Sequence, residues 1–108
     1  MFCLPCVFSG AGIEHLCAVI RGERLAYLNL DYNKIGDDGM AALGTAMHQL
    51  GNQFGTLEIA HNCIGNDGMR SFASNIARAS CLPFVVVAND NLASAEAMQA
   101  VLAAASGV

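Results

Sequence analysis

The sequence repeats itself at a fixed spacing. A shift of 29 places residues 25–53 on residues 54–82, and seven positions are then identical. In the first copy these positions are Leu28, Asn33, Ile35, Gly36, Asp38, Gly39 and Met40; in the second they are Leu57, Asn62, Ile64, Gly65, Asp67, Gly68 and Met69. A fixed period of this length indicates stacked units, each burying its apolar side against its neighbours. The repeat therefore predicts one domain over residues 1–108.

Two weaker copies flank the central pair. A further shift of 29 places residues 83–108 on the second copy, with Asn91 at the position of Asn62. A shift of 27 places residues 1–24 on the first copy as a partial unit, with Cys3 at the position of Leu30. The chain is therefore divided into about three and a half units, with boundaries at 1–24, 25–53, 54–82 and 83–108.

Each unit has the pattern of a strand followed by a helix. Leu28 and Leu30 alternate with polar residues, which is typical of a half-buried strand. Met40, Leu43 and Met47 then follow at helical spacing. Short polar side chains just before or inside each expected first turn are predicted to cap that helix. These are Asp37, Asp38, Asn66, Asp67 and Ser94. The pattern predicts an α/β fold.

Residues 25–39 have the pattern LxxLxLxxNxIGxDG, which resembles the leucine-rich repeat. The IGxDG turn resembles the ribonuclease-inhibitor-like subfamily of these proteins. The resemblance implies a leucine-rich-repeat solenoid that forms a short right-handed horseshoe segment. Its parallel sheet would lie on the concave face and its helices on the convex face. It also implies a scaffold for protein binding rather than a catalyst.

A structural ladder is expected where each chain turns inward after its strand. A buried amide there can donate to and accept from backbone groups that the sheet leaves unpaired. The ladder positions are Cys6, Asn33, Asn62 and Asn91. The family pattern accepts Asn or Cys at this position, so Cys6 fits it.

The binding surface is expected on the concave sheet face, between and just after the strand leucines. Its predicted residues are Tyr27, Asn29, Asp31, Tyr32, Thr56, Glu58, His61, Val87, Asn89 and Asp90, with Ala60, Val85 and Phe2 beside them. Both tyrosines of the chain fall on this strip, and tyrosine often anchors interfaces. Its acidic residues favour a partner protein with a basic surface. The alternative is that these are ordinary solvated strand residues.

No catalytic, metal or cofactor site is expected. Cys3-x-x-Cys6 resembles half of a zinc site, but no second ligand pair occurs, so core packing is the preferred interpretation. Residues 31–42 lack the acidic ligands that a calcium loop needs. His15, His48 and His61 are far apart and show no metalloprotease spacing. The sequence predicts a protein that is not an enzyme.

Composition narrows the partners and the compartment. The net charge is −4 with five Lys and Arg residues, which disfavours nucleic acid and anionic lipid as partners. No apolar run is long enough to span a membrane. Five scattered cysteines do not form a secreted disulfide pattern, which indicates a reducing, cytoplasmic location. Cys17 is expected to be buried, and Cys63 and Cys81 to be exposed in loops.

Three interpretations remain open. The first is a protein–protein interaction module. The second is a non-catalytic activator or regulator of a GTPase, because similar repeats occur in activators of the Ran GTPase. The third is a fragment of a larger repeat scaffold. Stacks of this kind usually have polar caps over their end units, and none is evident here. Self-association through uncapped ends is therefore also expected.

Overall fold

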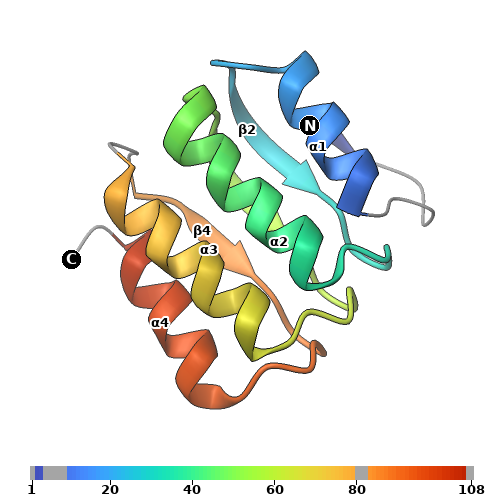
Figure 1. Ribbon diagram of the computed structural model, residues 1–108, viewed down its shortest axis with the longest axis vertical. Helices are drawn as coiled ribbons and strands as arrows, with labels where there is room; N and C mark the ends of the chain where they lie inside the picture. The colour runs from blue at the N-terminus through green and yellow to red at the C-terminus, as the bar shows by residue number, and fades with distance from the viewer. Residues whose placement is uncertain (1, 4–9, 80–82, 107–108) are drawn as a thin grey trace.

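The computed structural model describes residues 2–3, 10–79 and 83–106, in which strands and helices alternate (Figure 1). The elements in chain order are β1 (Phe2–Cys3), α1 (Gly10–Val19), β2 (Arg24–Asn29), α2 (Gly36–Thr45), the short π-helical segment η1 (Ala46–Leu50), β3 (Gln53–Glu58), α3 (Asn66–Arg78), β4 (Val85–Val87) and α4 (Ala95–Ala105).

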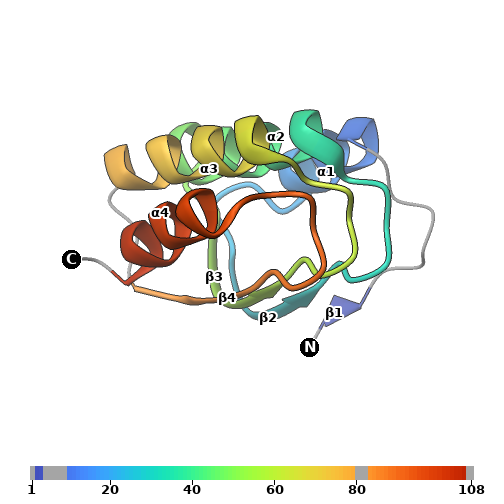
Figure 2. The same cartoon turned by 90° about the horizontal axis from the view of Figure 1, so that it is seen from below.

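The described elements form two layers. The four strands make one parallel sheet in the order β1-β2-β3-β4, so strands that follow one another in sequence lie side by side. The helices cover one face of this sheet and leave the other face open, as Figure 2 shows. This is the α/β repeat fold with a small parallel sheet that the repeat in the sequence predicts.

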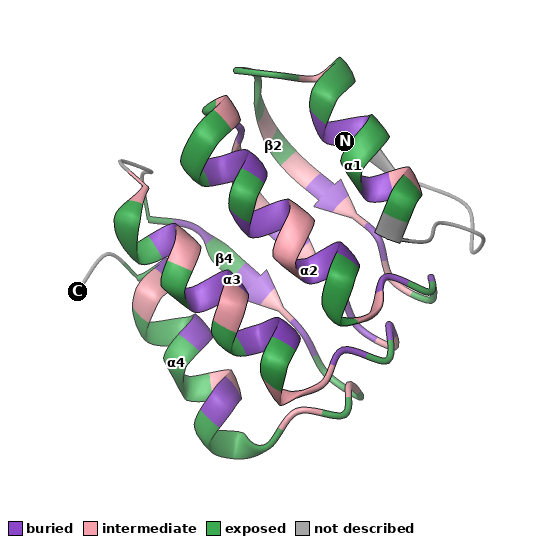
Figure 3. Ribbon diagram, in the orientation of Figure 1, coloured by how far each residue is buried: buried purple, intermediate pink, exposed green. Residues whose placement is uncertain are grey.

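The strand register keeps the repeat in the three complete units. Leu28 pairs with Leu57, and Leu57 pairs with Val86, so each residue lies beside its equivalent in the next unit. Leu28 and Leu57 are fully buried under the helices, and Val86 is nearly so. Figure 3 shows buried positions along α2 and α3, and Met40 and Met69 on these helices are fully buried. The core thus lies between the two layers.

The register of the first unit differs from the sequence prediction. The backbone of Phe2 pairs with Leu28 and that of Cys3 with Asn29, which is a shift of 26 rather than 27. The predicted match of Cys3 with Leu30 is therefore wrong by one position. Ile13 in α1 is fully buried like Met40, so the helix does keep the shift of 27. The strand and the helix of this unit thus follow two different shifts.

The helix starts also correct a prediction, since Asp37 and Asn66 do not cap their own helices. The carboxylate of Asp37 accepts a hydrogen bond from the N–H of Gly65, at 2.7 Å, in the following unit. The amide oxygen of Asn66 accepts from the N–H of Ser94, at 2.6 Å. Ser94 does cap α4, accepting from the N–H of Ala97 at 3.3 Å. Asp37 and Asn66 are therefore bridges between units.

A further buried amide joins units at the opposite end of the strands. Asn52 is fully buried; its side chain accepts from the N–H of Gly22 at 2.9 Å and donates to the carbonyl of Cys17 at 3.1 Å. Gly22 and Gly51 occupy equivalent positions in successive units, and both have φ of +75°. Glycine takes this left-handed conformation without steric cost. Asn52 was not expected from the repeat, because the equivalent position in the next unit is Cys81.

Candidate functional site

The asparagine ladder occupies the buried edge of the site. Asn62 is fully buried, and its oxygen accepts from the N–H groups of Asn33, at 3.1 Å, and Ile35, at 3.3 Å. Its amide nitrogen donates to the carbonyls of Leu30, at 2.8 Å, and Ala60, at 2.9 Å. One side chain thus satisfies four backbone groups in two adjacent units, as a structural ladder residue should.

Asn91 makes three equivalent contacts one unit further on, and its fourth is to the carbonyl three residues before it rather than two. It accepts from the N–H groups of Asn62, at 2.9 Å, and Ile64, at 3.1 Å. It donates to the carbonyls of Ile59, at 2.8 Å, and Ala88, at 3.1 Å. Asn33 likewise donates to the carbonyl of Leu30. The fourth predicted ladder position, Cys6, lies outside the described residues.

The residue before each ladder asparagine forms an exposed row across the three complete units. Tyr32, His61 and Asp90 have φ of +59°, +55° and +57°, a conformation that bulky side chains rarely adopt. The rings of Tyr32 and His61 stack, with centroids 4.3 Å apart and an 8° angle between the planes. His61 Nε2 lies 3.1 Å from the Asp90 carboxylate. We call these three residues the left-handed row.

A second group lies beside the row on the open sheet face. The Tyr27 hydroxyl donates to the Glu58 carboxylate across β2 and β3. This hydrogen bond raises the pKa of Tyr27, and desolvation and the charges of Glu58 and Asp31 raise it further, while Asn29 opposes them. The Asp31 carboxylate accepts from the N–H of Ala60 at 2.7 Å, so it also joins two units.

The remaining predicted residues complete the same face. Thr56 pairs with Tyr27 on one side and Val85 on the other, and Glu58 stands between Asn29 and Val87 in the same way. Asn89 is exposed, and its carbonyl accepts from the N–H of His61 at 3.1 Å. The described members of the predicted surface therefore lie together, but Ala60, which was expected beside them, is buried. Phe2 is aligned by its backbone with Leu28, whereas the predicted register would have placed it opposite Asn29.

The predicted surface on the open sheet face carries mainly polar and aromatic side chains. Its exposed groups are mainly aromatic rings, amides and carboxylates, with the hydroxyl of Thr56 and the apolar side chain of Val85 beside them, and the carboxylates of Asp31, Glu58 and Asp90 give it an acidic character. Within the described ranges, no group of three or more His, Cys, Asp or Glu residues is placed to hold a metal ion. Such a surface can bind hydrogen-bond donors and cations through its carboxylates and its aromatic rings.

Two cysteines have the exposure that their repeat positions predict. Cys17 is buried, and burial raises the pKa of its thiol to about 11, so it stays protonated at neutral pH. Cys63 is exposed in the loop before α3. Cys81 lies outside the described residues. In the part of the chain that the structure describes, no helix has the length and apolar character needed to cross a membrane.

Sequence reasoning placed the row on this surface but missed its backbone conformation and its internal contacts. The available signal was positional, because each row residue directly precedes a ladder asparagine in successive units of the repeat. The turn that brings the amide inward imposes the same φ on three different side chains. A stacking and ion-pairing row follows from that shared geometry.

The comparisons with known proteins agree with this repeat geometry. A family profile described as Leucine Rich repeat matches residues 25–44 and 56–73. These two segments cover most of the two central units, from the strand to the helix. The comparison with curated proteins gives no match.

Proposed function

Since this chain is a leucine-rich repeat protein, we propose that it is a protein–protein interaction module that binds its partner on the open sheet face. Repeats of this kind are typical protein-interaction modules. We further propose that the units belong to the ribonuclease-inhibitor-like type, and that they follow a right-handed horseshoe solenoid whose concave side is this face. The IGxDG turns at Ile35–Gly39 and a sheet in sequence order support this assignment.

The observation that supports the proposal best is the left-handed row. Tyr32 is 60% exposed, yet its ring is already held against His61, and His61 is held by Asp90. A side chain that is ordered before binding loses little conformational entropy when a partner covers it. Non-glycine residues in this backbone region are costly, and such strain is concentrated at functional sites. The row thus combines a large aromatic contact with low mobility.

The charge of the face determines the partner that we propose. Asp90 contacts His61, Glu58 contacts Tyr27 on the same face, and the chain as a whole has a net charge of −4. A basic protein surface would be attracted by this field and would find carboxylates to pair with. The proposed activity is binding alone, without catalysis, cofactor, nucleic acid or membrane, in the cytoplasm.

The proposal is tested by capture from cell extract with matched baits. One bait has the native sequence, and the second combines Tyr32→Asn with Glu58→Lys, which removes the exposed ring and reverses one charge. Asparagine tolerates the left-handed conformation, so the turn is kept. The control bait carries Glu14→Lys, the same charge reversal on the exposed surface of α1. We expect native and control baits to retain one protein that the double variant loses.

Salt dependence provides the second readout. If charge guides recognition, affinity for the captured protein should fall as ionic strength rises from about 0.05 to 0.5 M, because screening shortens the range of the field. Equal capture by all three folded baits would place the site elsewhere and refute the open-face assignment. Capture that is independent of salt would refute the basic partner while leaving the site in place.

A further inference from the structure

The units at 25–53 and 54–82 are each followed by another unit in the sheet, and we call them the covered units. Four backbone N–H groups in each covered unit donate to the unit that follows. In the first complete unit, Leu30 donates to the carbonyl of Glu58 at 2.8 Å, and Tyr32 donates to that of Ala60 at 3.0 Å. The other two, from Asn33 and Ile35, meet at the side-chain oxygen of Asn62. The second unit repeats this set from Ile59, His61, Asn62 and Ile64.

The equivalent N–H groups of the unit at residues 83–106 lie at the outer edge of the described sheet. They belong to Ala88, Asp90, Asn91 and Ala93, which occupy the positions of those four donors, and no acceptor among the described residues lies opposite them. Ala88 is only 6% exposed. Orphaned N–H groups on a buried residue are rare and costly, so this edge is suited to an added chain.

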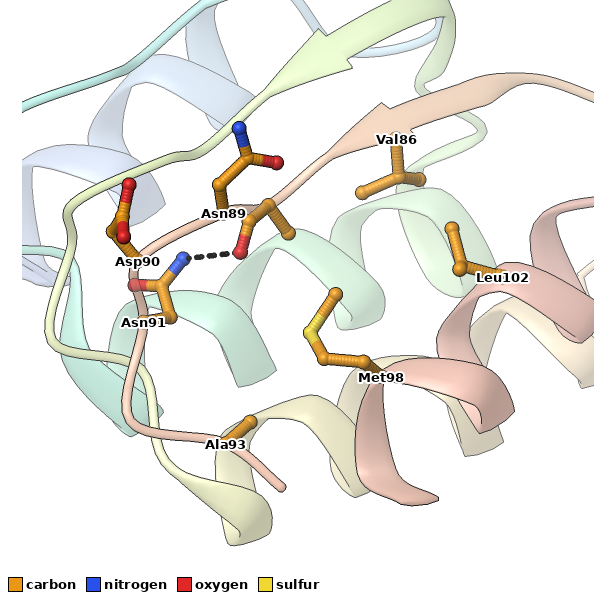
Figure 4. Close-up of a pocket in the computed structure, with 8 residues that line it drawn as sticks. Val86, Asn89, Asp90, Asn91, Ala93, Met98 and Leu102 are labelled. Atoms are coloured by element: carbon orange, nitrogen blue, oxygen red, sulfur yellow. Dashed lines mark hydrogen bonds between the residues drawn. The ribbon is translucent and has the colours of Figure 1, made fainter. Parts of the chain in front are cut away.

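A hollow of about 240 Å³, apolar on the side of the helix and polar on the side of the turn, adjoins these donors. Figure 4 shows Val86 from β4 and Met98 and Leu102 from α4 around it, with Asn91 at its polar end. In the covered units, the side chain of the next strand fills this place, as Leu57 does against Leu28. The last unit thus offers both parts of a strand site: backbone donors and a recess for an apolar side chain.

Leu102 distinguishes this edge from the contacts between the described units. The equivalent residues in the covered units are small: Gly44 and Ala73, both buried. A Cβ on Gly44 would lie 2.9 Å from Cβ of Asn75 and 3.2 Å from Cα of Phe72, so the next helix passes directly over this position. Leu102 occupies it in α4 and is 48% exposed. A further helix at that distance would meet the leucine, whereas a strand alone would not.

We propose that the free edge of β4 binds an extended segment of another protein as a fifth parallel strand. One apolar side chain of the segment enters the hollow beside Leu102. An asparagine that follows the strand presents its oxygen to the N–H groups of Asn91 and Ala93, as Asn62 does for Asn33 and Ile35. This is strand addition, in which main-chain bonds supply affinity and the pockets supply specificity. The site adjoins the left-handed row, because Asp90 belongs to both, but the proposal does not rest on the function proposed above.

A second copy of this chain does not offer such a segment. Asn33 and Asn62 are 4% and 0% exposed within their own stack, so neither is accessible to another molecule. Residues 1–24 have a cysteine, Cys6, at the ladder position, and a thiol is a weaker acceptor for two N–H groups than an amide oxygen is. A partner with an accessible apolar-x-apolar-x-x-Asn segment fits the donors and the hollow better than self-association does.

The test uses a synthetic peptide with the sequence of residues 25–36, LAYLNLDYNKIG, which contains the strand pattern and its asparagine. It is titrated into the ¹⁵N-labelled full chain while the amide resonances are followed. We expect saturable shifts at Ala88, Asp90, Asn91 and Ala93. A peptide in which the asparagine that corresponds to Asn33 is replaced by alanine should bind roughly tenfold more weakly, since two acceptor contacts are lost.

A matched pair of variants locates the site on the protein. Leu102→Arg places a charge in the hollow and should weaken binding at least about tenfold. Leu92→Arg makes the same change in the same unit, at a side chain that is 74% exposed. Its counterparts Lys34 and Cys63 remain exposed in covered units, so the added strand should not touch it. Circular dichroism checks that both variants are folded.

The outcomes separate clearly. Edge-amide shifts that the alanine peptide and Leu102→Arg both reduce would support the proposal. Saturable shifts centred on Tyr32 and His61 would overturn it, as would the absence of saturation at millimolar peptide. Equal binding by the Leu102→Arg and Leu92→Arg variants would also overturn it, because the hollow would then play no part. Concentration-dependent dimerisation without peptide, measured by sedimentation, would show that a second copy is the occupant and so contradict it.

Discussion

Two lines of side chains cross the same three units, at adjacent positions of the repeat. The buried line is Asn33, Asn62 and Asn91, and the exposed line is Tyr32, His61 and Asp90. The buried line repeats one residue type, whereas the exposed line has three different ones. The exposed line varies in residue type although its φ is nearly constant, so the difference between the lines lies in what each side chain must satisfy.

Hydrogen-bond demand explains the contrast. The asparagine must donate to and accept from backbone groups that water does not reach, and few side chains have both capacities. The exposed position must only tolerate a positive φ, which leaves its chemistry free to vary. Stability is therefore concentrated in the buried line, and we propose that recognition uses the exposed line. This division can be tested by exchanging residues in each line.

The largest effect is expected for Asn62→Ala. The substitution leaves two N–H groups and two carbonyls without their partner in a fully buried position. We expect a loss of about 1–3 kcal/mol in the free energy of unfolding. Urea denaturation followed by circular dichroism measures it. An unchanged midpoint would show that Asn62 is not a structural ladder residue.

A smaller loss is expected for Asn91→Ala. Asn91 also bonds four backbone groups but is only partly buried at the open edge, so water can replace some of these bonds. We expect a loss of about 1 kcal/mol or less in the same urea experiment. A loss equal to that of Asn62→Ala would mean that exposure does not modulate the ladder, and the proposed openness of this edge would be weakened.

The sequence revealed more of the buried line than of the exposed one. Identical residues at equivalent positions of the repeat predicted the register of Leu28 with Leu57 and the place of Asn62. Sequence identity cannot show a shared φ among Tyr32, His61 and Asp90, because different residues occupy that position. It also could not find Asn52, whose counterpart is a cysteine.

The predictions of the register of the first unit and of the helix caps were wrong, and both errors have physical causes. In the first unit, the strand and the helix follow different shifts, so the apolar spacing of α1 misassigns Cys3. At the helix starts, a short polar side chain can reach an N–H group of its own helix or of the neighbouring one. The position of Asp37 in sequence does not reveal which of them it bonds, and the structure shows that it bonds Gly65.

The exposed line should tolerate substitution with little change in stability. His61→Asn keeps a residue that accepts the left-handed conformation while removing the stack with Tyr32 and the contact with Asp90. We expect the free energy of unfolding to change by no more than about 0.5 kcal/mol, as for most surface changes. A loss above about 1.5 kcal/mol would show that the row supports the fold, and the division between the two lines would fail.

The smallest effect concerns Tyr27, beside the exposed line. Its hydrogen bond to Glu58 raises its pKa in the folded chain, so the folded state holds this proton more tightly than the unfolded state does. The stabilisation is complete below the unfolded value of about 10 and is lost as pH rises through the folded pKa. In Glu58→Gln the carboxylate charge is gone, and the pKa of Tyr27 should fall towards its ordinary value.

Ultraviolet titration of the phenolate measures this shift, with Tyr32→Phe as the background so that only Tyr27 titrates. A Thr56→Ser variant serves as the control, since Thr56 pairs with Tyr27 across the strands but contributes no charge. We expect the control to keep the raised pKa and the Glu58→Gln variant to lose it. If both keep it, the cause is not the carboxylate. The acidic contact that we assign to the open face would then be absent in solution, and the argument for a basic partner would lose one of its charges.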